Sequence, residues 1–189
     1  MSMPAKILNL TVEEYLAAEE TAKVRHEYVD GQIYAMTGAT DNHNRICGNI
    51  FAFLHSHLKT AGCQPYINNM KVRIEATNCF YYPDILISCE AYDGKSVYKS
   101  EPVAILEVLS PSTSKIDLRE KLIAYKQIPS LREYGLVYQD QQRIELHRRI
   151  SERLWQSLTI LPPDQLMLSS CTDPLHIPLS EIYDRTDIK

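Results

Sequence analysis

The stretch PVAILEVLSPSTSKIDLREKLIAYKQIPSLREYGLVYQ, residues 102–139, decides the fold. It begins with a nearly continuous apolar run and ends with a second one, REYGLVYQ. Short apolar runs of this kind are typical of strands that are covered on both faces. The segment between them carries apolar residues at helical spacing, namely Leu118, Leu122 and Tyr125. Asp117 and Glu120 have capping-box spacing and Pro129 provides a stop, so the stretch predicts a strand, a crossover helix and a further strand.

Two further elements are predicted near the N-terminus. Thr11 and Glu14 have capping-box spacing ahead of good helix formers, which predicts a helix over roughly residues 11–20. The sequence RHEYVDGQIYAM then alternates in polarity around Asp30-Gly31. This pattern predicts a β-hairpin with its turn at that pair.

The longest helix is expected in DNHNRICGNIFAFLHSHLKTAG, residues 41–62, because its apolar residues recur every three or four positions. Gly62 suits the C′ position that ends such a helix. The remaining elements are strands in QPYINNMKVRI (64–74), YYPDILIS (81–88), QRIELHRR (142–149) and RLWQSLTI (153–160), and a short final helical turn in IPLSEIYD (177–184).

Together these elements predict one domain over residues 1–189, of the α/β (mixed α+β) class. We expect a central mixed β-sheet flanked by helices on both faces. The chain has 189 residues, of which 44% are apolar, and this suffices for one sizeable core. It shows neither a signal-peptide pattern nor an apolar run of membrane-spanning length. We therefore expect a soluble, cytoplasmic protein with no membrane partner.

Cysteine usage and charge narrow the function classes. An odd number of cysteines, five, without a CxxC pair predicts reduced, mostly buried thiols and argues against a disulfide framework or a zinc ribbon. The net charge of −4 excludes a uniformly basic surface, so a nucleic-acid contact would need a local basic patch. The densest basic stretch is HRRISER, residues 147–153. It is interpreted either as a solvated loop between strands or as a phosphate contact.

Asp84 and Glu107 are the acidic residues within two neighbouring apolar strands. A carboxylate in such a position is costly unless a cation, backbone N–H groups or a metal ion compensates it. Two carboxylates at one strand end repel each other, which favours a divalent cation, and oxygen ligands suit Mg²⁺ or Mn²⁺. The alternative is that Asp84 accepts backbone hydrogen bonds while Glu107 pairs with Lys71 or Arg73.

Lys121 favours the metal interpretation. It lies in the predicted crossover helix on the face that carries Leu118 and Tyr125, which is the face expected to pack against the sheet. The alternative for Lys121 is a pair with Asp117 at i,i+4 spacing on an exposed surface. Tyr125 is interpreted as a core residue that could also hydrogen-bond near the site.

The segments YYPDILIS, ILEVLSPST and DLREKLIAYKQIPSLREYGLVY resemble a large family of restriction-endonuclease-like proteins, abundant in photosynthetic bacteria, within the PD-(D/E)xK nuclease superfamily. The similarity runs from about residue 14 to about residue 148. The resemblance implies a core sheet of four or five strands and a Mg²⁺-dependent phosphodiesterase site. It assigns Asp84 as the metal aspartate, Glu107 as the second acidic ligand and Lys121 as the lysine. Independently of the resemblance, Val108 next to Glu107 could donate a peptide carbonyl to the same cation.

The sequence departs from the superfamily pattern two residues after Glu107, where Leu109 stands in place of the expected lysine. Lys121 would then be a migrated lysine that arrives from the helix. The resemblance also adds Glu27 and His43 to the site. Without it, Glu27 would be interpreted as an exposed strand residue paired with Arg25 or Lys23, and His43 as an exposed polar residue.

The resulting function is a Mg²⁺- or Mn²⁺-dependent endonuclease that leaves 5′-phosphate and 3′-hydroxyl ends, as the resemblance implies. The expected partners are nucleic acid, in the first place DNA, and a second copy of the chain in a homodimer. Three alternatives stay open: a nuclease-fold binding or scaffold protein without turnover, a hydrolase acting on RNA or on branched or single-stranded ends, and a structural domain with a buried ion pair. A zinc site at His43 and Cys47 is rejected because no four ligands converge in spacing.

Overall fold

The computed structural model describes residues 9–110, 115–171 and 173–188, and the side chains of the third helix from Leu118 onward. The described helices are α1 (Val12–Thr21), α2 (Asp41–His57), α3 (Lys115–Tyr125), α4 (Leu179–Ile182) and a 3₁₀ turn over Glu75–Thr77. The fold is a mixed α+β architecture, as predicted.

The strands of the described residues form three sheets. The five-stranded sheet has the order β2-β1-β5-β4-β7, with bounds Gln32–Ala35, His26–Val29, Cys79–Tyr81, Lys71–Ile74 and Tyr98–Lys99. The six-stranded sheet has the order β11-β10-β9-β8-β6-β3, with bounds Trp155–Ile160, Ile144–Arg149, Glu133–Tyr138, Pro102–Leu109, Ile85–Ser88 and Gln64–Ile67. The third sheet pairs β12 (Gln165–Leu168) with β13 (Leu175–Pro178).

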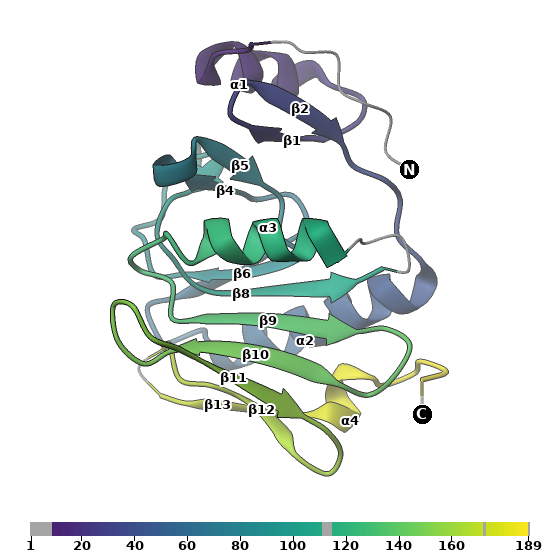
Figure 1. The fold of residues 1–189 in the computed structure, drawn as a ribbon. Coiled ribbons are helices and arrows are strands. Elements are labelled where there is room, and N and C mark those ends of the chain that lie inside the picture. Colours follow the sequence, from purple (N-terminus) through teal and green to yellow (C-terminus); the bar gives the residue numbers. More distant parts are fainter. Residues whose placement is uncertain (1–8, 111–114, 172, 189) are drawn as a thin grey trace.

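Helices and sheets alternate as layers (Figure 1). Helix α1 covers the outer face of the five-stranded sheet, where Tyr15 packs on Tyr28 and Phe80. Helix α3 lies between the two larger sheets, and α2 packs on the opposite face of the six-stranded sheet. This sheet is thus covered on both faces, which explains why its central strand β8 is almost wholly apolar.

Several sequence predictions are confirmed. Thr11 Oγ1 accepts a hydrogen bond from Glu14 N–H and Glu14 Oε2 accepts one from Thr11 N–H, which is the predicted capping box of α1. The β1–β2 hairpin turns at Asp30 and Gly31, with φ of 46° and 91°. This pair of positive φ angles is what an Asp-Gly turn provides.

The crossover is also confirmed, because β8 and β9 are parallel neighbours and α3 connects them. The predicted capping pair Asp117 and Glu120 lies partly outside the described side chains. Helix α3 ends at Tyr125, before the predicted stop at Pro129, because a hydrogen-bonded turn follows Tyr125 directly.

Three predictions about element bounds and number are wrong. Helix α2 ends at His57 and not at Gly62, which has φ 71° in the turns beyond the helix. The run 64–74 forms two strands in different sheets, because Asn68 adopts φ 56° and turns the chain between β3 and β4. The core sheet has six strands where the resemblance implied four or five.

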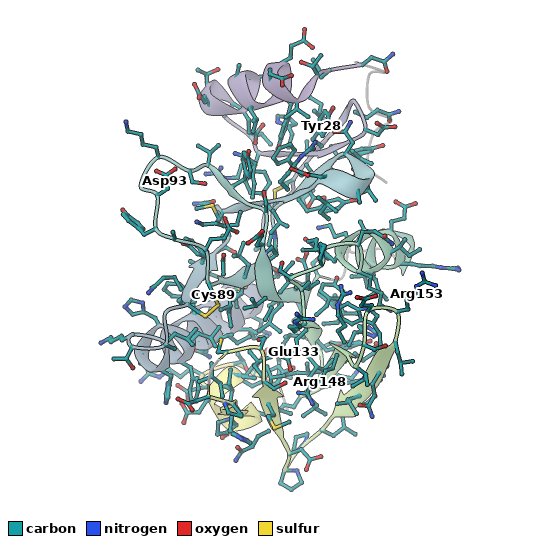
Figure 2. All side chains as sticks on the ribbon, turned by 90° about the vertical axis from the view of Figure 1, so that its left-hand side faces the viewer. Tyr28, Cys89, Asp93, Glu133, Arg148 and Arg153 are labelled. Carbon is teal, nitrogen blue, oxygen red and sulfur yellow. A yellow bond between two sulfur atoms is a disulfide. The ribbon has the colours of Figure 1, made fainter. Side chains whose placement is uncertain are left out.

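The prediction that all cysteines are reduced is wrong for one pair. Cys63 and Cys89 form a disulfide, whereas Cys47, Cys79 and Cys171 are free and buried. The register of β3 and β6 pairs Gln64 with Ser88, so the residues just outside this pair face each other across the strands. Cys89 is visible with its yellow bond in Figure 2. An odd cysteine count carries no information about such adjacency in space.

The basic stretch 147–153 is mainly structural and is only partly a loop. Arg148 Nε donates to Glu133 Oε1 at 2.8 Å, and Glu133 is fully buried (Figure 2). Glu133 also accepts from the backbone N–H groups of Ser169 and Ser170. Arg149 donates to backbone carbonyls that follow α3, namely those of Lys126, Ile128 and Leu131. These contacts hold two of the basic side chains inside the protein.

Among the described residues, no helix has both the length and the apolar character needed to cross a bilayer.

Candidate metal and phosphodiester site

The two acidic residues meet where the chain passes between the two larger sheets. Asp84 follows Pro83 in the short link from β5 to β6. Strands β6 and β8 are antiparallel with Ile85 opposite Leu106, so Asp84 lies beside Glu107 in register. The predicted strand neighbourhood of Asp84 and Glu107 is therefore confirmed.

Successive side chains of β8 point to opposite faces of the six-stranded sheet. Leu106 and Val108 belong to the core beneath α2, whereas Glu107 lies on the face that meets α3. Asp84 stands at the strand end between these layers. The site is thus built from the ends of the inner strands β6 and β8, the first turn of α2, the middle of α3, and β1 of the other sheet.

Asp84 is held from two sides. Its Oδ2 accepts a hydrogen bond of 2.7 Å from the backbone N–H of Val108. The same oxygen lies 3.2 Å from Nε2 of His43, and the side chain of Asp84 is 16% exposed. The backbone contact matches the alternative interpretation of Asp84, but the exposed fraction and the histidine contact leave the carboxylate accessible to a ligand.

Glu107 is more deeply buried, at 7% exposed. Its Oε1 accepts a hydrogen bond of 3.1 Å from Tyr125 Oη and lies 3.6 Å from Lys121 Nζ. Burial raises the pKa of Glu107 to about 7; Lys121 opposes this rise, while Asp84 adds to it. The alternative partners Lys71 and Arg73 are wrong, since both contact other residues.

Lys121 connects the acidic groups. Its Nζ lies 2.6 Å from Glu27 Oε1 and 5.3 Å from the centre of the Tyr81 ring. Burial alone would lower the pKa of Lys121, but Glu107 and Glu27 together raise it above its ordinary value. The alternative pair with Asp117 concerns a side chain outside the described residues.

Glu27 reaches the site from β1 in the other sheet. Its Oε1 accepts a hydrogen bond of 3.4 Å from the backbone N–H of Tyr82 as well as the contact from Lys121. Arg25, the partner expected without the resemblance, lies over the Tyr82 ring instead. Glu27 is therefore a member of the cluster and not a surface strand residue.

His43 lies in the first turn of α2 and is also not a plain surface residue. Its Nε2 faces Asp84, and its Nδ1 lies 3.6 Å from the sulfur of buried Cys47. Burial alone would lower the pKa of His43, but the hydrogen bond to Asp84 raises it above the ordinary value. Ligand atoms of His43, Cys47 and Asp84 lie within 4.8 Å of one another.

Comparison with known proteins agrees with this architecture. Residues 12–180 match the model of a family described as "Putative restriction endonuclease". The chain belongs to this family. Two relatives are the uncharacterized proteins slr1290 and sll1609 of Synechocystis sp.. The first is 35% identical over 89% of this chain and 90% of its own, and the second is 32% identical over 77% and 84%.

A solved structure shares the fold. It is the crystal structure of "a putative nuclease belonging to DUF820" from Anabaena variabilis. The match has a TM-score of 0.73 and covers 92% of this chain and 97% of the other, at 17% sequence identity. The likeness at this identity concerns the arrangement of the backbone, and it agrees with the restriction-endonuclease-like fold expected from the sequence.

Oxygen donors gather around Lys121, whereas the described ligand atoms that all lie within 4.8 Å of one another are those of His43, Cys47 and Asp84. Asp84, Glu107 and Glu27 supply three carboxylates, and each contributes to the pKa shift of Lys121. Lys121 offsets one of these charges and a protonated His43 would offset a second, so an excess of negative charge remains once Glu107 is ionised. Carboxylate and carbonyl oxygens are the ligands that Mg²⁺ and Mn²⁺ prefer.

Several contributors were not assigned from the sequence. The Tyr82 N–H that holds Glu27 is a backbone group, and a sequence pattern carries no signal for it. The N-cap Thr40 accepts from His43 N–H and donates to Gln139 Oε1 at 2.6 Å, which ties the first turn of α2 to the end of β9. Thr40 stands before Asp41, and this capping signal could have been found by the usual N-cap rule.

Proposed function

We propose that this protein is a divalent-metal-dependent nuclease that hydrolyses phosphodiester bonds. The observation that carries the proposal is the convergence of Asp84, Glu107, Glu27 and Lys121, from four separate elements, at the end of β8. The family description and the name of the Anabaena structure support the same class of reaction.

In this proposal Asp84, Glu107 and the Val108 carbonyl hold the cation, and Glu27 either joins them or holds a water beside it. The chemistry that bound Mg²⁺ or Mn²⁺ supplies is polarisation of a phosphoryl oxygen and a lower pKa for an attacking water. Only the ionised form of Glu107 can serve as a ligand. Because burial raises its pKa to about 7, cation binding should strengthen as the pH rises through that value.

Lys121 has the role that the superfamily gives to the strand lysine. Its ammonium lies 2.6 Å from Glu27 and 3.6 Å from Glu107, so it is held at a fixed place between both carboxylates. From there it orients the attacking water or offsets the negative charge that grows on the phosphate in the transition state. Tyr125 is a positioning residue, since its hydroxyl fixes Glu107 Oε1.

His43 is placed to act on the other side of Asp84. Its Nε2 lies 3.2 Å from Asp84 Oδ2. A protonated imidazole there contributes a positive charge toward a scissile phosphate, and a neutral one fixes the orientation of the Asp84 carboxylate. The substrate is proposed to be DNA, and a homodimer would allow each copy to cut one strand of a duplex.

A second candidate is a nuclease-fold protein that binds nucleic acid without cutting it. The observation in its favour is Leu109, which occupies the place of the usual strand lysine. The two functions differ in one assay. Wild type and Lys121→Met are incubated with supercoiled plasmid, single-stranded DNA and RNA, with Mg²⁺, with Mn²⁺ and with a chelator. Metal-dependent cleavage that Lys121→Met abolishes supports the nuclease, whereas binding without cleavage in every condition supports the second candidate.

A further inference from the structure

A cleft of about 400 Å³ lies on the α1 side of the five-stranded sheet, whereas Glu107 and Lys121 lie between this sheet and the six-stranded sheet. We call it the α1 cleft. Its wall comes from the second half of α1, the segment 22–25, the turn 69–71 and residues 96–97. Three cationic side chains line it, those of Lys23, Arg25 and Lys71. None of these belongs to the candidate metal site.

Lys71 forms the charged floor of the α1 cleft. The residue is 7% exposed, and its Nζ donates to Tyr82 Oη at 3.3 Å. Among the described residues, no carboxylate forms an ion pair with this ammonium. An ammonium has three N–H donors, of which one bonds to the Tyr82 hydroxyl while the group faces the Tyr82 ring at 5.3 Å. Such a group is costly unless an anion meets it there.

The carboxylates of the α1 cleft do not meet this need. Glu19 is 4% exposed in its side chain and already accepts from His26 N–H and from Tyr82 Oη. These contacts join α1 to β1 and reach Lys71 only through the tyrosine hydroxyl. Glu20 is exposed at the rim. Burial lowers the pKa of Lys71, and the nearby Glu19 opposes this decrease without cancelling it.

Tyr82 connects the α1 cleft with the candidate metal site. Its backbone N–H donates to Glu27, while its ring lies beneath Arg25 at 5.4 Å and its hydroxyl accepts from Lys71. Tyr82 thus contacts groups of both places, with its hydroxyl at Lys71 and its backbone N–H at Glu27. A polyanionic strand that continues beyond the metal site offers further phosphates to the cations of the α1 cleft.

We infer that the α1 cleft binds a phosphate group of the same nucleic-acid strand that occupies the candidate metal site, with Lys71 and Arg25 as the contacts. This inference rests on the proposed function for the identity of the strand. A point-charge ammonium and an arginine are the side chains that hold phosphate oxygens without reading bases. The contact would position the strand and leave sequence preference unchanged.

The test measures binding separately from cleavage. Asp84→Asn is the background, so that no strand is cut, and fluorescence anisotropy reports the affinity for a single-stranded oligonucleotide at several salt concentrations. Lys71→Met is compared with Lys59→Met, which removes an exposed lysine next to the end of α2. We expect Lys71→Met to weaken binding about tenfold and to reduce the salt slope by about 0.7, the value of one phosphate contact to a single strand. Lys59→Met should change neither quantity.

Two further arms make the result decisive. Arg25→Gln changes an exposed side chain at the cleft rim, so it tests the same contact if Lys71→Met fails to fold. Inorganic phosphate should raise the melting temperature of wild type more than that of Lys71→Met. If phosphate stabilises wild type but the oligonucleotide affinity is the same in all variants, the α1 cleft holds a free phosphate and the inferred strand contact is wrong.

Unchanged affinity and unchanged salt slope in folded Lys71→Met and in Arg25→Gln would overturn the inference. This outcome is distinguishable from failure of the proposed function. If wild type cuts no nucleic acid but Lys71→Met still lowers strand affinity, the phosphate contact stands and the nuclease proposal fails.

Discussion

The carboxylate of Asp84 accepts a 2.7 Å hydrogen bond from the backbone N–H of Val108. One oxygen of the proposed metal ligand Asp84 is thus fixed by the backbone N–H of Val108, the residue whose own carbonyl is proposed as another ligand. Asparagine can still accept this hydrogen bond, whereas alanine leaves the N–H without a partner. We predict that Asp84→Asn melts close to wild type and that Asp84→Ala loses about 1–3 kcal/mol of unfolding free energy in urea. Equal stability of both variants would contradict this role of the hydrogen bond.

The raised pKa of Glu107 predicts a pH-dependent stability in the presence of a chelator. The folded protein keeps a proton on Glu107 up to about pH 7, whereas the unfolded chain releases it near the ordinary value of 4.5. The free energy of unfolding therefore falls by about 3 kcal/mol as the pH rises between these two values. Urea unfolding of wild type and Glu107→Gln between about pH 5 and about pH 7.5 measures the difference. Parallel curves for the two proteins would show that Glu107 titrates normally.

Lys121→Met removes the ammonium that lies between Glu27 and Glu107. We predict that it lowers the rate of cleavage at least about 100-fold while strand binding changes little, because the lost stabilisation acts on the transition state. Lys59→Met, on the exposed surface beyond α2, is the matched control and should cut at the wild-type rate. Full activity of Lys121→Met would refute the migrated-lysine assignment.

The buried ion pair of Arg148 and Glu133 is predicted to be a major determinant of stability. Arg148→Met leaves the fully buried carboxylate of Glu133 without its cation, which should cost about 3–5 kcal/mol. Arg153→Met changes an exposed arginine in the same basic stretch and should leave stability within about 0.5 kcal/mol. Chemical denaturation of both variants decides the point. If both variants change the stability by equally small amounts, the interpretation of the stretch 147–153 as a solvated loop is favoured instead.

The disulfide between Cys63 and Cys89 closes a segment with a sequence separation of 26. A loop of this length predicts a stabilisation of about 3 kcal/mol by restriction of the unfolded chain. Non-reducing peptide mapping should find this pair linked and the three buried cysteines free. The double variant Cys63→Ser, Cys89→Ser should unfold at lower urea than wild type, and the two should unfold alike once wild type is reduced.

Local sequence rules predicted the parts of the fold that depend on neighbours along the chain. The capping box at Thr11 and Glu14 and the turn at Asp30-Gly31 satisfy hydrogen bonds and φ angles within a few residues. The apolar run 102–109 indicated a doubly covered strand, and β8 is one. The two-sheet division of residues 64–74 escaped prediction, because one left-handed Asn68 changes the partner of the following strand.

The residues of the candidate site were likewise only partly predictable from the sequence itself. Asp84 and Glu107 stood out because a charge inside an apolar run has a physical cost that the sequence itself displays. Glu27 and His43 came only from the resemblance, since nothing in their own segments distinguishes them from surface residues. Their contacts with Lys121 and Asp84 are long-range, and they depend on how β1 and α2 pack against β8. The same holds for Lys71, whose burial in the α1 cleft is visible only in three dimensions.

The most direct test of the central claim is a calorimetric titration of the protein with Mg²⁺ and with Mn²⁺, at a pH above about 7 so that Glu107 is ionised. Asp84→Asn is titrated beside wild type, because it keeps the hydrogen bond to Val108 and lacks the negative charge. We predict that wild type binds a divalent cation and that Asp84→Asn loses this binding while it remains folded. Absence of binding in wild type, or equal binding in both proteins, would contradict the assignment of Asp84 and Glu107 as a metal site.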